Sequence, residues 1–95
     1  MIVHIIMIKL KEDQKNEAET IRTRLLALPP QIDVIKHYDV GLNIVASSRN
    51  YDVVVYSKFT SLDTMAVYIQ HPKHQEVAAY IGGVADKIAV VDYEE

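Results

Sequence analysis

The stretch Tyr68-Ile69-Gln70-His71-Pro72-Lys73-His74 predicts a sharp corner between two helices. Pro72 has no amide hydrogen and disfavours helical geometry at the residue before it, so one helix should end here and a second should begin. Tyr68 then lies near the end of the first helix and His74 near the start of the second, facing each other. Nearly every side chain able to do chemistry is concentrated in this stretch, so the rest of the chain is interpreted as its scaffold.

Helical patterns flank the corner on both sides. Before it, Thr60 is the expected N-cap, with Asp63 three residues further on in the position that completes a capping box. Four apolar residues of this helix are expected to face inward: Leu62, Met65, Ala66 and Ile69. The hydroxyl of Tyr68 should then reach the rim of a pocket. After the corner, one face of the second helix carries His74, Val77, Ala78 and Ile81. Gly82-Gly83 should end that helix.

The remaining segments alternate between strand and helix patterns. Residues 2–10 are apolar on both alternating faces, which is typical of a strand covered on both sides. An amphipathic helix is expected over residues 14–28, with Asp13 as its N-cap and Pro29-Pro30 ending it. The other expected segments are an edge strand at 32–40 that Gly41 closes or bends, a loop at 43–50, a strand at 52–59 and a final strand at 87–93.

The order strand, helix, strand, strand, helix, strand predicts an α+β fold of the ferredoxin-like βαββαβ type, in a single domain over residues 1–95. Its antiparallel four-stranded sheet would carry the helices on one face and leave the other bare. Seven mostly apolar side chains would lie on that bare face: Val3, Ile5, Met7, Val54, Tyr56, Ala89 and Val91. Because such a patch exceeds what a soluble monomer normally exposes, we expect a homodimer with two sheets face to face.

The composition limits the classes of binding partner and the cellular location that we expect. Thirteen acidic and ten basic side chains give a net charge of −3, and the basic residues are scattered, so a nucleic-acid partner is not expected. The apolar runs are too short to cross a membrane, and the first residues lack the pattern of a signal peptide. The absence of cysteine excludes disulfides and thiolate catalysis. The expected location is cytoplasmic.

Five short segments spread over nearly the whole chain form a specific combination. They are Val3-His4-Ile5-Ile6, Val40-Gly41-Leu42-Asn43, Tyr51-Asp52, the corner from Tyr68 to His74, and Val91-Asp92-Tyr93-Glu94. With them the chain resembles the stress-responsive A/B barrel domain family, also called Dabb domains. The resemblance implies a dimeric α+β barrel, in agreement with the order of strands and helices. It implies little about activity, since most members have no assigned reaction and some plant members are linked to stress tolerance.

One plant member of that family is a cofactor-free polyketide cyclase that closes a ring by aldol condensation. The Tyr and the second His of its Tyr-x-x-His-Pro-x-His segment are its catalytic pair, and the resemblance carries these roles to Tyr68 and His74. Its pocket histidine on the first strand corresponds to His4. Two positions differ: Val53 stands where that enzyme has a histidine, and Ala85 where it has a tryptophan. The resemblance therefore implies at most a Tyr/His pair in a cavity.

Two interpretations of the pair remain open. In the first, the chain is a cofactor-free cyclase or isomerase acting on a carbonyl compound, with His74 as the base and Tyr68 donating to the developing enolate oxygen. The expected substrate-binding walls are His4, Ile6, Ile8, Val53, Val55 and Val77. In the second, His74 only fixes the corner, and the chain is a non-catalytic stress-response module that binds a small hydrophobic ligand. A pocket of about 300 Å³ or more holding both rings would favour the first, and a filled core the second.

We expect simpler roles for the other histidines. His71 and His74 lack the i, i+4 spacing of helical zinc ligands and are interrupted by Pro72, so no metal site is expected. His71 should cap the helix junction instead, and His37 should be solvated. His4 either lines the pocket or is a core histidine with its hydrogen bonds satisfied.

Overall fold

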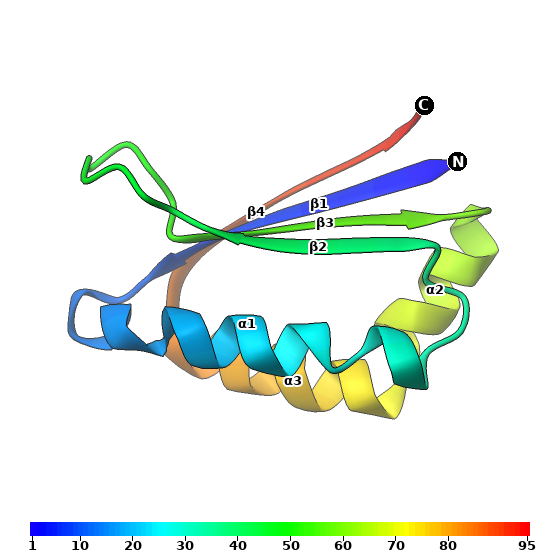
Figure 1. Cartoon of the computed structure of the whole chain (residues 1–95), viewed down its shortest axis with the longest axis horizontal. Helices are drawn as coiled ribbons and strands as arrows, with labels where there is room; N and C mark the ends of the chain where they lie inside the picture. The colour runs from blue at the N-terminus through cyan, green and yellow to red at the C-terminus, as the bar shows by residue number, and fades with distance from the viewer.

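One layer of helices covers one face of a four-stranded sheet in the computed structural model, which describes residues 1–95 (Figure 1). The strands are β1 (Ile2–Leu10), β2 (His37–Leu42), β3 (Val53–Phe59) and β4 (Ala85–Glu94). The helices are α1 (Ala18–Leu26), α2 (Leu62–Gln70) and α3 (Pro72–Val84), with the short 3-10 segments η1 (Glu12–Glu17) and η2 (Pro29–Gln31) on either side of α1. None of them has both the length and the apolar character of a membrane-spanning helix. The α+β, ferredoxin-like prediction is confirmed.

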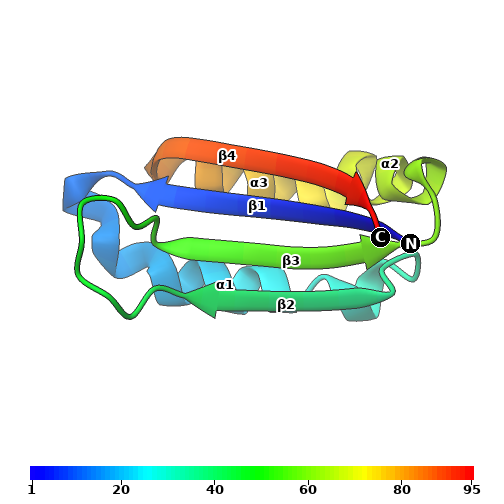
Figure 2. The same ribbon diagram turned by 90° about the horizontal axis from the view of Figure 1, so that it is seen from above.

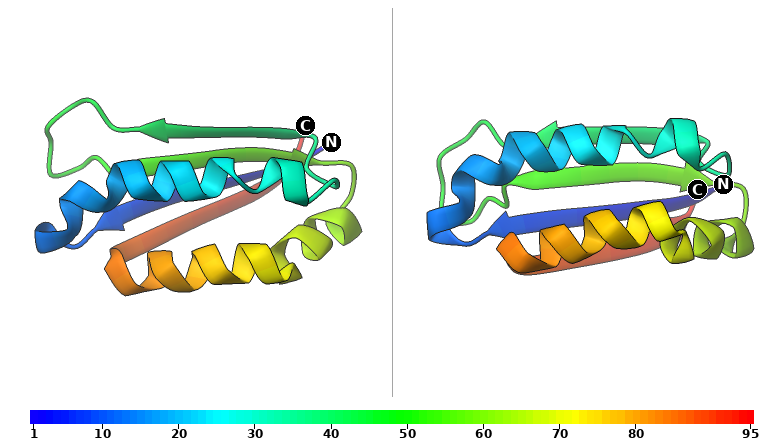
Figure 3. Two further views of the ribbon diagram at one scale, coloured as in Figure 1. Left: turned by 60° about the horizontal axis from the view of Figure 1, so that its bottom comes forward. Right: turned by 90° about the horizontal axis from the view of Figure 1, so that it is seen from below.

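The sheet is antiparallel throughout, with the strand order β2-β3-β1-β4 (Figure 2). Residues directly opposite each other in neighbouring strands share a face. Ile5 lies opposite Tyr56 and Val91 on the face turned away from the helices, which we call the open face. Seen from the helix side, α1 lies against β2 and β3, and α3 lies against β1 and β4 (Figure 3). The predicted edge position of the second strand is confirmed.

The hydrophobic core lies between the sheet and the helices. Thirteen buried residues form one cluster there, among them Phe59 and Ile8 from the sheet and Ile21 from α1. Burying one such side chain stabilises the fold by about 1.5–3 kcal/mol. Val3 is also fully buried but lies outside this cluster, because it is on the open face. Three other side chains of the open face, Met7, Val54 and Val91, stay 36–55% exposed in the single chain.

The first helix starts later than predicted. Asp13 does not cap an α-helix, because it lies inside η1, whose N-cap is Lys11 and which has no side-chain cap. In this turn the amide of Gln14 donates to the carbonyl of Lys11 at 2.9 Å, a 3-10 hydrogen bond that replaces the α-helical pattern. The Nζ of Lys15 forms a salt bridge with Oδ2 of Asp52 at 2.9 Å, which connects this turn to the start of β3. The regular helix therefore begins only at Ala18 and ends at Leu26, before the two prolines.

The cap of α2 is also displaced by one residue. Ser61, and not Thr60, is the N-cap: its Oγ accepts from the Thr64 amide at 3.1 Å, and the Thr64 hydroxyl oxygen accepts from the Ser61 amide at 3.2 Å. This is a reciprocal capping box with threonine in the position predicted for an acidic residue. Leu62, predicted to face inward, is 62% exposed.

Three other boundaries differ from the prediction, two of them at glycines. The edge strand begins at His37, and Ile32 is buried in the core before it. Gly41 lies inside β2, opposite Val54, and does not close the strand. Gly82 and Gly83 keep helical backbone geometry without a positive φ, so α3 continues to Val84 and β4 follows directly from Ala85.

Candidate functional site

The predicted corner between α2 and α3 is confirmed. His71 has extended backbone angles, φ −64° and ψ 135°, and is the single residue between the two helices. Its ring nitrogen Nδ1 accepts a hydrogen bond from the Lys73 amide at 3.1 Å, so the predicted capping role of His71 is confirmed as well. Pro72 occupies the first position of α3, where a missing amide hydrogen costs no helical bond.

The helical pattern predicts that the Tyr68 hydroxyl reaches the rim of a pocket. In the structure Tyr68 lies in the core instead. Only 2% of it is exposed, and its ring centroid lies 5.0 Å from that of Phe59. Its hydroxyl is 2.8 Å from the hydroxyl of Tyr38 on β2, so one phenol donates to the other. A buried phenol is stable only with such a partner. Tyr38 is a site residue that was not predicted, although the alternation along β2 places it on the helix-covered face with Val40.

His74 lies beside Tyr68, with ring centroids 4.4 Å apart. Its Nδ1 is 2.9 Å from the carbonyl oxygen of Ile69. Because a carbonyl only accepts, Nδ1 carries the hydrogen and donates it, which leaves a lone pair on Nε2. Burial lowers the pKa of His74 below its ordinary value, although the bond to Ile69 acts in the opposite direction. The imidazole is therefore neutral near pH 7, with Nε2 able to accept a proton.

The two phenols keep their protons under all ordinary conditions. Burial raises the pKa of Tyr38 to about 12. Burial, together with the neighbouring Tyr38, also raises the pKa of Tyr68. Two protonated phenols hold two hydroxyl hydrogens, and only one of these is needed for the bond between them. The phenol that accepts in this bond therefore keeps its own hydrogen free.

His4 is a core histidine with a carboxylate partner. Its Nδ1 is hydrogen-bonded to Oδ1 of Asp92, which lies directly opposite it on β4. The His4 side chain is 6% exposed and that of Asp92 39%. The His4 ring centroid is 6.4 Å from that of Tyr68. No role was predicted for Asp92, although the alternation Ile88, Val90, Asp92 places its side chain on the face of His4.

A cavity of about 130 Å³ between the sheet and α3 holds both Tyr68 and His74 on its wall. Of the residues predicted to bind substrate, three line it: Ile6, Ile8 and Val55. The other three, His4, Val53 and Val77, are buried nearby but are not on its wall. The rest of the lining is Leu25, Ala78, Ile81 and Ile88. The cavity is thus almost entirely apolar apart from the Tyr/His pair, and it is smaller than the 300 Å³ expected of an enzyme pocket.

Comparison with known proteins places the whole chain in one family. Residues 2–95 match the family described as Dabb, stress responsive A/B barrel domain. The stress-response A/B barrel domain-containing protein HS1 of Arabidopsis thaliana is 34% identical over 58 residues, which cover 61% of this chain and 53% of that protein. The match thus spans about half the length of HS1. A second Arabidopsis thaliana protein of the same description, At5g22580, is 28% identical over 93 residues, covering 95% of this chain and 82% of the relative.

A solved structure has the same fold as this chain. A dimeric protein of unknown function with a ferredoxin-like fold from Bacteroides fragilis superposes with a TM-score of 0.88 at 29% identity. The superposition covers 99% of this chain and 95% of that one. This chain therefore belongs to the Dabb family of stress-responsive A/B barrel domains.

Proposed function

We propose that the cavity beside the helix corner binds a small carbonyl compound and that His74 transfers a proton at the carbon next to the carbonyl. The observation that carries this proposal is the hydrogen bond from His74 Nδ1 to the Ile69 carbonyl at 2.9 Å. It leaves Nε2 as a neutral base, held 4.4 Å, ring centre to ring centre, from Tyr68 in an apolar cavity.

The proposed step uses only groups of this chain. Nε2 of His74 takes the proton from the carbon next to the carbonyl, the C–H electron pair forms a carbon–carbon double bond, and the π pair of the carbonyl moves to its oxygen. With Tyr38 donating to the Tyr68 hydroxyl, Tyr68 donates its own hydrogen to the enolate oxygen that forms. In a β,γ-unsaturated carbonyl compound, return of the proton from His74 to the γ carbon gives the conjugated isomer. In a compound with a second carbonyl, attack of the enolate carbon on that carbonyl closes a ring, and the proton from His74 goes to the new alkoxide oxygen. Neither step requires a metal ion or a bound cofactor.

The cavity limits the size of the group that reacts. Its volume of about 130 Å³ is close to the roughly 150 Å³ of an apolar cavity that accepts benzene. The reacting part of the ligand is therefore about the size of a six-membered ring. Ala78 and Ile88 line the cavity and are exposed to solvent, so a longer apolar tail would leave past them.

The same proposal includes a homodimer formed through the open face. Met7, Val54 and Val91 are exposed there, and pairing two open faces would remove these apolar side chains from water. The dimeric state of the Bacteroides fragilis relative supports this arrangement. A cytoplasmic location stays a prediction from the sequence.

A second function is favoured by the small size of the cavity. At about 130 Å³ it falls short of the 300 Å³ typical of sites that enclose a whole substrate. In this alternative the chain is a non-catalytic stress-response module that holds a small hydrophobic ligand. His74 and Tyr68 would then only position that ligand and fix the corner.

One experiment separates the two functions. Cyclopentanone in D₂O is incubated with the protein, and exchange of the hydrogens next to its carbonyl is followed by proton NMR. His74→Ala should lower the exchange rate by about 100-fold or more, in the range of a lost general base. The matched control is His71→Asn, which removes a histidine from the same corner and keeps a residue that can cap α3.

Each outcome of that experiment decides between the two functions. Exchange that persists in His71→Asn and disappears in His74→Ala supports proton transfer. Binding of the ketone, detected as amide shift changes around the cavity, without any exchange supports the ligand-binding alternative. If neither exchange nor binding is seen with cyclopentanone or with the longer 2-heptanone, the carbonyl proposal is wrong.

A further inference from the structure

Apolar side chains are exposed to solvent on the segment of residues 43–52 between β2 and β3, which we call the arm. It rises from the sheet on the side away from the helices (Figure 1). Ile44, the second residue of the arm, is 95% exposed, and the neighbouring Val45 is 55% exposed. Two adjacent exposed aliphatic side chains on a loop are unfavourable in a monomer unless another surface covers them.

The arm is held in this position by its own hydrogen bonds. Asn43 is at the centre: its Nδ2 donates to the Val45 carbonyl at 2.7 Å, and its Oδ1 accepts from Asn50 Nδ2 at 2.9 Å. Lys9 of β1 donates to the carbonyl of Ser48 at 2.6 Å, which fastens the far side of the arm to the sheet. The exposed position of Ile44 is therefore built into the fold.

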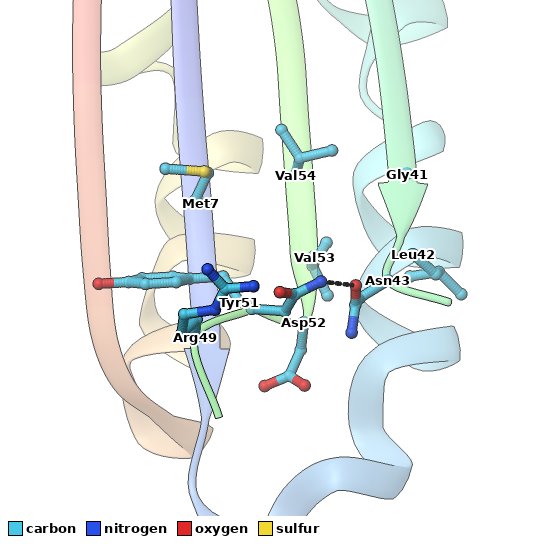
Figure 4. A pocket seen from close by; sticks show the side chains of 10 residues that line it. Met7, Gly41, Leu42, Asn43, Arg49, Tyr51, Asp52, Val53 and Val54 are labelled. Carbon is cyan, nitrogen blue, oxygen red and sulfur yellow. Dashed lines mark hydrogen bonds between the residues drawn. The ribbon is translucent and has the colours of Figure 1, made fainter. Parts of the chain in front are cut away.

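A hollow of about 450 Å³ lies where the arm leaves the open face. Met7 of β1 and Val54 of β3 line it, together with Gly41 at the end of β2 (Figure 4). A side chain at Gly41 would enter this space, since a Cβ there would meet Val54 Cγ1 at 3.1 Å. The glycine thus keeps the hollow open on the same face that the proposed dimer would bury.

We propose that the arm clasps a second copy of this chain: Ile44 and Val45 pack against the partner, and a side chain of the partner enters the hollow. This inference rests on the proposed homodimer and identifies the residues that complete it. The arm and the hollow are continuous with the apolar open face and rise toward the side where the partner would lie. In a two-fold dimer each contact is made twice, so both arms would be covered at once.

The charges of the open face fit a second copy better than an apolar ligand. Asp39 of β2 and Lys87 of β4 point to this face, since they lie opposite Tyr56 and Lys9, and neither is in an ion pair within the chain. Arg49 on the arm has no acidic partner within the chain either. A surface with free charges of both signs around an apolar centre can complement its own copy.

The test measures the dimer dissociation constant by sedimentation velocity for the native chain and two variants. Ile44→Asp places a charge on the arm, and Leu62→Asp places the same charge on an exposed leucine of α2, in the helix layer. Ile44→Asp should raise the dissociation constant by about 100-fold, because two buried isoleucines are lost per dimer. Leu62→Asp should leave it within about twofold of the native value.

A second measurement keeps the proposal testable if a variant folds poorly. The chain has no cysteine, so Ile44→Cys and Leu62→Cys can each carry one environment-sensitive fluorophore. The label at position 44 should shift to shorter wavelength as concentration rises through the dissociation constant, and the label at position 62 should not. A native dimer with neither effect at position 44 overturns the clasp and leaves the dimer standing. A native chain that stays monomeric overturns both.

Discussion

The imidazole of His74 and the carbonyl of Ile69 are hydrogen-bonded at 2.9 Å across the corner between α2 and α3. In an uninterrupted helix that carbonyl would accept from the amide of Lys73, four residues later. Here the Lys73 amide donates to His71 instead, at 3.1 Å. The break at Pro72 thus frees the acceptor that orients the His74 ring.

The first prediction concerns the pH dependence of stability. Burial depresses the pKa of His74 in the folded state below the ordinary histidine value near 6.5. Below that pH the unfolded chain binds a proton that the folded chain resists, so stability present at pH 7.5 should be lost progressively as the pH falls below 6.5. Urea unfolding at pH 7.5 and 5.5 measures the loss, and His74→Gln should reduce it. An equal loss in the variant would contradict the assignment to His74.

The hydroxyl pair of Tyr38 and Tyr68 should behave as one unit. Changing either residue to phenylalanine leaves the other hydroxyl without its partner in the core, which should cost about 1–3 kcal/mol of unfolding free energy. The double change removes both hydroxyls and should cost clearly less than the two single losses together. Urea unfolding of the four proteins gives the coupling energy. Strict additivity would show that the bond does not contribute.

Asp92 should stabilise the fold through His4. Removing its carboxylate in Asp92→Ala leaves a nitrogen of the buried imidazole without its partner, for an expected loss of about 1–3 kcal/mol. The matched control is Asp86→Ala, an exposed aspartate on the same strand with no ion pair. Thermal unfolding compares the two, and similar midpoints would argue against a role for the pair.

The displaced cap of α2 gives a test of which residue starts the helix. Ser61→Ala removes the oxygen that accepts from Thr64 and should cost about 1 kcal/mol, or roughly 4–8 °C in the midpoint of thermal unfolding. Thr60→Ala should cost less than half as much, because Thr60 does not accept the helix amide. The reverse order of midpoints would restore Thr60 as the cap.

The strands, their order along the chain and the corner at Pro72 could be predicted from the sequence, because each depends on residue type over a short window. Residues 2–10 are apolar on both faces, which predicts a strand whichever strands lie beside it. A proline interrupts a helix in any context. The capping residues could not be separated in this way. Thr60 and Ser61 are adjacent and both suitable, and only the folded backbone, which is extended at Ser61 and helical from Leu62, distinguishes them.

The burial of Tyr68 and the hydrogen-bond partner of His4 could not be predicted, because both depend on contacts between residues distant in sequence. Periodicity along α2 alone assigned Leu62 inward and Tyr68 to the rim, since it takes no account of a second phenol on β2. Tyr38 precedes Tyr68 by 30 residues, and Asp92 follows His4 by 88. Predicting either contact requires the register between strands and helices, which the sequence pattern does not fix.

The single residue between α2 and α3 has a consequence for how this scaffold can change. The two polar rings of the cavity are set by two helix ends joined through His71, whereas its shape is set mainly by aliphatic residues of other elements, such as Leu25 and Ile88. Exchanging those aliphatic residues should redesign what fits without moving the rings. Related chains could therefore bind ligands of different shape and still present the same tyrosine and histidine to them.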